Sequence, residues 1–378
     1  MPQLGSLIPQ GLTIMVVAQA HKLGHVDAVF MGALLQAATL QLGSYNPQEL
    51  ANTASALATQ HHAGNAFLDA LVEAATLKLG SFNPQDMVML LGALAKLVHD
   101  DTVFTGKLLR AATLKLGSFN PLDVAMLLWA LAKLDHDDTV FTNNLLRAAM
   151  PQLGSFTPQG LANTAWALAK LGREDADFMA ALVEAATLQL GSVNSQELAN
   201  TAWALAKLGH VDVDFMDALV EAATLQLVSF NPQELANTAW ALAKLGHVDA
   251  DFMAALVEAA TLQLGSFNQQ GLANTAWALA KLGHLDAVFM GALVQAATLR
   301  LGSFNSQDLA NTAHEQVLRV IRQLPYCSYV TREHKTDGGL FSIDIAVTSQ
   351  GGVKVAVEVD GPTHFLSTRQ PDGARLPG

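Results

Sequence analysis

The sequence has little charge and almost no cysteine. Only 14% of its 378 residues are charged, and Cys327 is the single cysteine. One thiol excludes an intramolecular disulfide framework and is typical of a protein of a reducing compartment. Long apolar runs that could span a bilayer are also missing, because Gly, Pro, Asn or Lys interrupts each one. Apolar residues still make up 51% of the chain, as expected for repeats that neighbours cover on both sides.

Basic residues are scarce too, which bears on nucleic-acid binding. Lys and Arg total 21 against 33 Asp and Glu, for a net charge of -12. From His314 to Gly378 the two signs cancel, so the part of the chain before them carries the whole excess. Binding to a polyanion would then depend on where the charges point more than on their sum.

One stretch of sequence is repeated along most of the chain. Leu235–Gly246 reads LANTAWALAKLG, and its near-copies, 37 residues apart, start at Leu161, Leu198 and Leu272. Weaker copies start at Leu12, Leu50, Met87 and Val124. A fixed period of this length is typical of a solenoid. We predict a mostly α-helical chain, with an α-solenoid of two-helix repeats over residues 1–313 and a small α/β domain over 314–378.

Each repeat has the pattern of two helices joined by a short turn. Asn231 is a good N-cap, and Glu234 completes a capping box. Gly246 ends the first helix. Asp249 or Asp251 can cap a second helix, which we expect to end at about residue 265. The repeats predict eight helical hairpins and the start of a ninth.

One face of the first helix carries polar and aromatic residues. Asn237, Trp240 and Lys244 are three and four residues apart, so they share a face. An amide can hydrogen-bond a base edge, an aromatic ring can stack on a base, and an ammonium group can neutralise phosphate. The candidate RNA-binding residues are Asn163, Trp166, Lys170, Asn200, Trp203, Lys207, Asn237, Trp240, Lys244, Asn274, Trp277 and Lys281. We expect the acids elsewhere, as in Glu184, Glu221 and Glu258 on the second helix.

Each of these residue types also has a structural interpretation. Tryptophan in a helical repeat more often packs between hairpins than stacks on a ligand. Asn237 and Thr238 also fit an internal polar ladder between neighbouring helices. Lysine in the last turn also fits an interaction with the helix dipole, although Lys22, Lys96 and Lys133 occupy the same place.

A histidine recurs in the turn after the first helix. Its members are His25, His62, His99, His136, His210, His247 and His284, with Arg173 taking one turn. Adjacent members would lie about 9 Å or more apart, too far to share a metal ion. We therefore expect a structural role at the end of the first helix, and no metal or cofactor in the solenoid.

After Ala313 the pattern changes to period two. Apolar residues alternate with polar ones from Phe341 to Val347 and again from Val353 to Val359. This alternation predicts a hairpin, in which we expect Val347 to pair with Val353. That register would bring three carboxylates together on the polar face, those of Asp344, Glu358 and Asp360.

These strands also carry a family resemblance. Ser342–Val347 and Val355–Phe365, which reads VAVEVDGPTHF, together resemble the RAP domain, a small RNA-binding domain. The residues that carry the motif are Asp344, Glu358, Asp360, Gly361, Pro362, His364 and Phe365. The array resembles octotricopeptide repeats and, in its 37-residue period, heptatricopeptide repeats.

The resemblance implies an RNA-binding protein of the mitochondrion or plastid. Such proteins support RNA processing, stability, translation or ribosome assembly. The implied partners are single-stranded RNA and other RNA-processing or ribosomal proteins, without a membrane. Met1–Ser6 copies Met150–Ser155, so we expect the chain to open at the tail of a repeat and to be a fragment, with a RAP domain truncated at Gly378.

Two other functions fit parts of the sequence. A protein-binding scaffold fits because helical solenoids commonly offer a concave surface to peptides, and low basicity favours it. A metal-dependent ribonuclease fits because RAP domains are similar to the restriction-endonuclease-like fold. Asp344 and Glu358 would then hold Mg²⁺ to activate water, although Asp360 stands where many such enzymes carry lysine. The expected role is non-enzymatic, with Mg²⁺ as a cofactor in the nuclease alternative alone.

Overall fold

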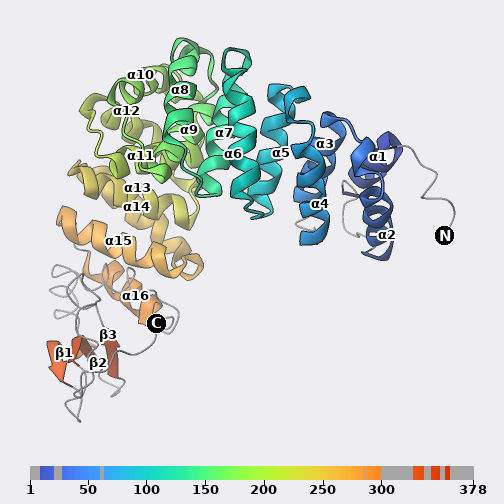
Figure 1. Ribbon diagram of the computed structural model, residues 1–378. Coiled ribbons are helices and arrows are strands. Elements are labelled where there is room, and N and C mark those ends of the chain that lie inside the picture. The colour runs from blue at the N-terminus through green and yellow to red at the C-terminus, as the bar shows by residue number, and fades with distance from the viewer. Residues whose placement is uncertain are drawn as a thin grey trace, which may run out of the picture. The chain divides into compact units, whose positions relative to one another are not determined.

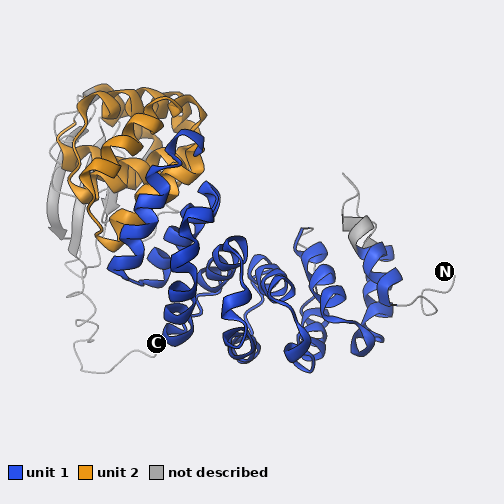
Figure 2. Cartoon of the chain, turned by 90° about the horizontal axis from the view of Figure 1, so that it is seen from above, with its two compact units in different colours: residues 1–193 blue, residues 194–378 orange. Residues whose placement is uncertain are grey.

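The computed structural model describes residues 9–20, 28–59, 64–284, 286–298, 327–335, 342–349 and 354–357. Within these ranges the chain forms sixteen α-helices followed by three β-strands (Figure 1). The chain divides into two compact units, Met1–Val193 and Asn194–Gly378 (Figure 2). The domain boundary expected after Ala313 lies outside the described residues. None of the helices in these ranges combines the length and the apolar character that crossing a membrane requires.

The helices alternate as first and second members of hairpins, which confirms the α-solenoid. The first helices are α1 Pro9–Ala20, α3 Pro47–Thr59, α5 Pro84–Lys96, α7 Pro121–Lys133, α9 Pro158–Leu171, α11 Ser195–Leu208, α13 Pro232–Leu245 and α15 Gln269–Leu282. The second helices are α2 Ala28–Thr39, α4 Asn65–Thr76, α6 Thr102–Thr113, α8 Thr139–Ala149, α10 Ala176–Thr187, α12 Val213–Thr224, α14 Ala250–Gln263 and α16 Ala287–Thr298.

The first helices begin at side-chain caps, as predicted. The Asn231 side chain accepts the backbone N–H groups of Gln233 and Glu234 at 3.0 Å, and Glu234 accepts the N–H of Asn231 at 2.9 Å. Reciprocal pairs of the same kind start α3, α7 and α11. Each cap satisfies N–H groups that have no partner inside the helix.

The first helices of most repeats end on a left-handed residue. Gly172, Gly209, Gly246 and Gly283 have φ between 64° and 72°, a region that glycine enters without a steric penalty. In α5 and α7 the same position is occupied by Val98 and Asp135, with φ of 54° and 52°. These two repeats therefore carry backbone strain that their neighbours avoid.

Six of the second helices begin at an aspartate, whereas α4 begins at Gly64 without a side-chain cap. The Asp249 side chain accepts the backbone N–H of Phe252 at 2.8 Å, so Asp249 and not Asp251 is the cap. An aspartate caps five other second helices in the same way: Asp101, Asp138, Asp175, Asp212 and Asp286. After the second helices come short 3₁₀ turns, which the sequence pattern did not predict: η2 Leu42–Ser44, η3 Leu79–Ser81, η4 Leu116–Ser118, η5 Met150–Ser155, η6 Leu190–Ser192, η7 Leu227–Ser229 and η8 Leu264–Ser266.

Consecutive first helices pack against each other within each unit. In the first unit α1, α3, α5, α7 and α9 form one row, and in the second unit α11, α13 and α15 form another (Figure 1). Small residues such as Ala239, Ala241 and Ala243 are fully buried at these contacts, which lets the helices approach closely. Phenylalanines before the first helices and in the first turn of the second helices complete the core; Phe230 and Phe252 are examples.

A side chain in each 3₁₀ region ties neighbouring repeats together. Gln263 Nε2 donates to the Phe230 carbonyl oxygen at 2.8 Å, and Gln189 Nε2 donates to that of Phe156 at 3.0 Å. In earlier repeats a lysine does the same: Lys115 Nζ donates to the carbonyl oxygens of Gly80 at 3.2 Å and Phe82. This inter-repeat link went unrecognised in the sequence, although the Thr-Leu-Lys/Gln-Leu-Gly-Ser pattern repeats visibly.

The C-terminal strands form an antiparallel sheet in the order β1-β2-β3, with β1 Cys327–Lys335, β2 Ser342–Ser349 and β3 Lys354–Val357. The alternating pattern predicted the second and third strands but missed the first. Val347 pairs with Val355, so the expected pairing with Val353 is wrong by two residues. Side-chain alternation determines which face is apolar, and a shift of two residues preserves it.

Candidate nucleic-acid interface

The first helices are buried on every side but one. Between Glu234 and Lys244 of α13, the residues that are not buried are Asn237, Trp240 and Lys244. The same three positions reach the surface on α9, α11 and α15. We call these positions the first-helix stripe: Asn163, Trp166 and Lys170 on α9; Asn200, Trp203 and Lys207 on α11; Asn237, Trp240 and Lys244 on α13; and Asn274, Trp277 and Lys281 on α15.

The amides of the stripe are half-buried. Asn163, Asn200 and Asn237 make no side-chain hydrogen bond to any residue that the structure describes. The internal polar ladder considered for Asn237 and Thr238 is therefore not formed by these two side chains. Thr238 is fully buried and its Oγ1 has no partner in the described part of the chain. The amide groups of Asn163, Asn200 and Asn237 keep their donors and acceptors for water or a ligand.

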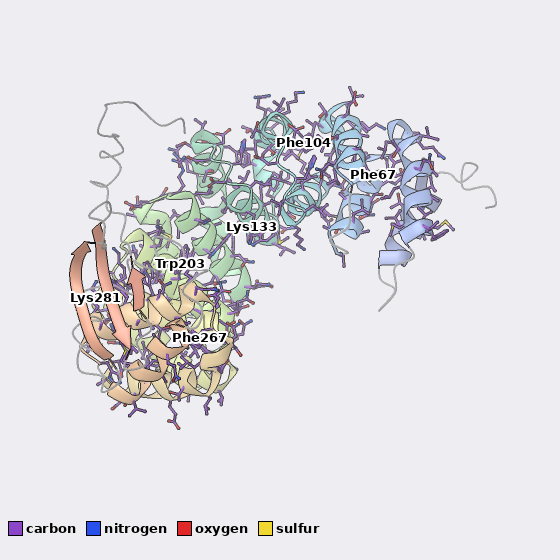
Figure 3. All side chains as sticks on the ribbon, turned by 90° about the horizontal axis from the view of Figure 1, so that it is seen from below. Phe67, Phe104, Lys133, Trp203, Phe267 and Lys281 are labelled. Atoms are coloured by element: carbon purple, nitrogen blue, oxygen red, sulfur yellow. The ribbon has the colours of Figure 1, made fainter. Side chains whose placement is uncertain are left out.

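The indole rings of the stripe are half-buried, and those of Trp166 and Trp277 meet ammonium groups, as does Trp129 on α7. Lys133 Nζ lies 5.9 Å from the ring centroid of Trp129 and 5.6 Å from that of Trp166 in the next repeat. Lys281 Nζ lies 4.8 Å from the centroid of Trp277. Both lysines are exposed, and Figure 3 labels them together with Trp203. Faces of these indoles are thus open to a solvated cation, while the rest of each ring packs between repeats.

Two neighbouring indoles also lie close together. The ring centroids of Trp240 and Trp277 are 6.4 Å apart, with 33° between the ring planes. This separation falls in the range of interacting aromatic pairs. Trp240 and Trp277 therefore pack against each other across a repeat boundary, and stacking of a ligand on either ring stays a prediction.

The lysines of the stripe carry its charge. Lys170, Lys207 and Lys244 are exposed, and none forms an ion pair with a described residue. Each stands in the last turn of its helix, where a cation is favourable for the helix dipole. That position still leaves the ammonium group free to meet an anion.

The acids of the first helices lie at their N-terminal ends, away from the lysines. Asp123 and Asp86 are buried, and burial raises the pKa of each carboxyl above its usual value, partly offset by a backbone N–H that the carboxylate accepts. Exposed acids lie on the second helices, as in Glu184, Glu221 and Glu258. The stripe is therefore polar, aromatic and basic on a chain with a net charge of -12.

Two of the recurring histidines, His99 and His247, contact a carboxylate of the preceding repeat. His99 Nε2 lies 3.4 Å from the Asp69 carboxylate, and His247 Nε2 lies 3.3 Å from that of Asp217. Arg173, which stands at the histidine position, forms a different ion pair, with Asp137 in the turn before α8. The backbone N–H of His247 closes the end of α13 by donating to the Leu242 carbonyl oxygen at 2.9 Å. Among the described residues no three His, Cys, Asp or Glu side chains could hold a metal ion.

The stripe changes in the N-terminal repeats. On α5 a half-buried Met89 takes the asparagine position and a buried Gly92 takes the tryptophan position, while Lys96 is retained and exposed. On α7 Met126 replaces the asparagine beside Trp129. The complete combination of amide, indole and ammonium is thus confined to α9, α11, α13 and α15.

The candidate C-terminal residues lie mostly beyond the described ranges. Asp344 lies in β2, whereas Glu358, Asp360, Gly361, Pro362, His364 and Phe365 lie outside the described residues. Ile345 pairs with Val357, which differs by two residues from the register on which the carboxylate cluster was predicted.

The fold and the stripe define a helical-repeat protein with a polar and basic candidate nucleic-acid face. The model of the RNA-editing substrate-binding complex 6 protein family (RESC6) matches residues 28–287. The match covers more than half of the chain, and the chain belongs to this family. A family of proteins of unknown function (DUF1601) matches residues 301–312.

Other comparisons add little. No curated protein matches the chain. The chain is similar to a structure described as a homology model of the full-length AP-3 complex in an intermediate open conformation, at 12% identity and a TM-score of 0.35. The likeness covers 84% of this chain and 62% of that chain, so this chain spans less than two thirds of that length. At such a score the likeness supports no conclusion about fold or function.

Proposed function

We propose that this chain binds single-stranded RNA along the first-helix stripe and works as one component of an RNA-processing assembly. The observation that carries the proposal is the stripe itself. Amides without a described side-chain partner (Asn163, Asn200 and Asn237) share their helix face with half-buried indoles and exposed ammonium groups, and these three positions recur on α9 of the first unit and on α11 and α13 of the second. These are the groups that contact base edges, base faces and phosphates in single-stranded nucleic acid.

Family membership supports the RNA-related part of this proposal. The matching family is named for a complex that binds the substrates of RNA editing. A chain of such a family would have both RNA and protein partners. The resemblance to RAP and heptatricopeptide proteins adds the proposal that the full-length protein works in a mitochondrion or plastid, which imaging of a tagged full-length protein would test.

The distribution of charged and aromatic side chains favours specific binding of single-stranded RNA over non-specific attraction of any polyanion. The described first-helix stripe has one cation per repeat and an aromatic ring one turn away, so a bound strand would gain stacking as well as phosphate contacts. Duplex RNA hides its base faces and would lose the stacking contribution. Single strands should therefore bind more tightly than duplexes of the same length.

Fluorescence titration of the protein with single-stranded and double-stranded RNA tests the proposal. We expect single strands to quench the tryptophan fluorescence and to bind more tightly than the duplex, with an affinity that falls as salt rises. Binding that leaves the tryptophan emission unchanged, or a preference for the duplex, would contradict it. Absence of RNA binding together with capture of a peptide partner would support the scaffold alternative.

The C-terminal segment needs a separate test. The RAP resemblance rests on the sequence of 342–365, and the nuclease alternative rests on Asp344 with residues outside the described ranges. Incubation of labelled RNA with the protein and Mg²⁺ or Mn²⁺ tests cleavage. Cleavage that is lost in Asp344→Ala would establish the nuclease, and intact RNA would leave binding as the function.

A further inference from the structure

The outward faces of the second helices carry charges of opposite sign in different repeats. On α6 the residues Val103, Lys107, Arg110 and Leu114 are all exposed. Their spacing of four, three and four residues places them on one face of the helix. On the neighbouring α8, Val140 and Arg147 occupy the positions of Val103 and Arg110 and are also exposed. We call this set the basic outer stripe.

The equivalent positions of the later repeats are acidic. On α12 they are Asp214 and Glu221, and on the neighbouring α14 they are Asp251 and Glu258, all exposed. We call these four residues, with the leucines that follow them, the acidic outer stripe. Each acid stands 111 residues, or three repeats, after its counterpart in the basic stripe. The two stripes therefore have the same position on the helix and the same repeat spacing.

A largely exposed leucine accompanies the charges in both stripes, as it also does after α4 (Leu77) and α10 (Leu188). Leu114 follows Arg110 by four residues and is 87% exposed, and Leu225 follows Glu221 by four residues and is 82% exposed. Leu262 stands in the same relation to Glu258 and is 82% exposed. An exposed leucine contributes no favourable free energy, whereas burial of each leucine in an interface would be favourable.

The charges of the two stripes have no partners within the chain. Arg110, Arg147, Glu221 and Glu258 form no ion pair with any residue in the described ranges. The acidic outer stripe repels a polynucleotide, so RNA does not explain both stripes. A surface with the same spacing and opposite charge explains both, and this chain itself carries that surface.

We infer that the protein associates with itself, with the basic outer stripe of one copy against the acidic outer stripe of another. Arg110 and Arg147 would face two acids one repeat apart, and the flanking leucines would pack at the edge of the contact. Each copy carries both stripes, one in each unit, so the same contact can form twice in a closed two-fold dimer or once per copy in a longer head-to-tail assembly. The inference does not depend on RNA binding.

Charge reversal tests the inference on the intact chain without RNA. We expect the wild-type protein to sediment as concentration-dependent oligomers at about 50 mM NaCl and to dissociate at about 500 mM, where screening is strong. Arg110→Glu with Arg147→Glu should weaken self-association by roughly tenfold or more, and Glu221→Arg with Glu258→Arg should do the same. All four positions are exposed, so the fold should be kept, as circular dichroism would verify.

Mixing the two variants gives the decisive outcome. Each variant alone lacks one of the two complementary stripes, whereas a mixture brings the unchanged acidic outer stripe of one variant together with the unchanged basic outer stripe of the other, so association should reappear in the mixture. Lys207→Glu with Lys244→Glu, which makes the same charge change on the first-helix stripe, should leave self-association unchanged. A wild-type protein that stays monomeric, reversed variants that still associate, or a mixture that stays monomeric would each overturn the inference.

Discussion

Lys133 reaches from its own helix toward the tryptophan of the next repeat, with its Nζ 5.6 Å from the ring centroid of Trp166. The same ammonium group lies 5.9 Å from Trp129, so it stands between two indoles of successive repeats. Cation–π contacts of this kind are worth about 0.5–1 kcal/mol at exposed sites. A base that stacks on either indole would compete with the lysine for the ring face, and the displaced ammonium group would remain close enough to meet a phosphate.

The tryptophans should contribute directly to RNA affinity. Trp240→Ala removes one stacking surface, which is worth about 1–3 kcal/mol per base, so single-stranded RNA should bind roughly 5- to 100-fold more weakly. Fluorescence anisotropy with a labelled strand measures the change. Val248→Ala, an exposed residue outside the stripe, serves as the matched control and should have no effect. Equal affinity in Trp240→Ala would show that this indole is a packing residue.

The repeated stripe also predicts which RNA binds. The repeats of α9, α11, α13 and α15 carry identical asparagine, threonine, tryptophan and lysine at the same positions. If each repeat contacts one base, the four must prefer the same base, so one homopolymer should bind more tightly than the others. Parallel titrations with four homopolymers measure this preference. Equal affinity for all four would refute base reading by the asparagines and leave backbone and stacking contacts.

Backbone strain at Val98 should be removable. Val98 has a φ of 54° and its side chain is 83% exposed, so Val98→Gly relieves the left-handed strain with little loss of packing. We expect the free energy of unfolding to rise by about 1 kcal/mol, measured as a higher midpoint of urea denaturation. Gly209→Val is the converse control: space around Gly209 is open, so any destabilisation comes from the backbone. A lower midpoint for Val98→Gly would contradict this explanation.

Asp123 is buried and completes the capping box at the start of α7. Its carboxyl should make the stability of the protein depend on pH. Burial raises the pKa of its carboxyl in the folded state above the usual 3.8, while the Asn120 backbone N–H opposes the rise. A carboxyl whose pKa is higher in the folded than in the unfolded state binds its proton more tightly when the protein is folded. Above that folded-state pKa the ionised carboxylate therefore lowers the free energy of unfolding. The cost disappears as pH falls through the folded pKa toward the unfolded value.

Asp123→Asn isolates this contribution because asparagine does not titrate and keeps an acceptor oxygen for the Asn120 N–H. The stability of the variant relative to the wild-type protein should be greatest near neutral pH and should decline toward pH 4. Urea denaturation at several pH values measures the difference. A relative stability that grows as the pH falls would show that the charge is favourable in the folded state.

Features set by local chemistry could be predicted from the sequence. The caps Asn231 and Asp249 hydrogen-bond N–H groups two or three residues away, so a short sequence pattern is enough to identify them. The stripe of Asn237, Trp240 and Lys244 follows from helical spacing alone. Its exposure follows as well, because alanine and leucine fill the other positions and pack against neighbouring helices.

Features that depend on geometry between repeats could not be predicted. The bond from Gln263 to the Phe230 carbonyl oxygen spans 33 residues, and the contact of His247 with Asp217 joins a turn to the preceding second helix. Neither has a pattern within one helix. The strand register failed for another reason: Val353 and Val355 are two residues apart, so the alternation of apolar and polar residues is the same for either pairing with Val347.

The most direct test of the RNA-binding account compares two charge reversals of equal size. Lys207→Glu with Lys244→Glu alters the first-helix stripe, and Lys107→Glu with Arg110→Glu makes the same charge change on α6. Anisotropy titrations with labelled single-stranded RNA would be run at protein concentrations low enough to avoid self-association. We expect the first variant to lose most of its affinity and to show a shallower salt dependence, while the second binds like the wild-type protein. Equal losses in both variants, or unchanged affinity in the first, would contradict RNA binding at the stripe.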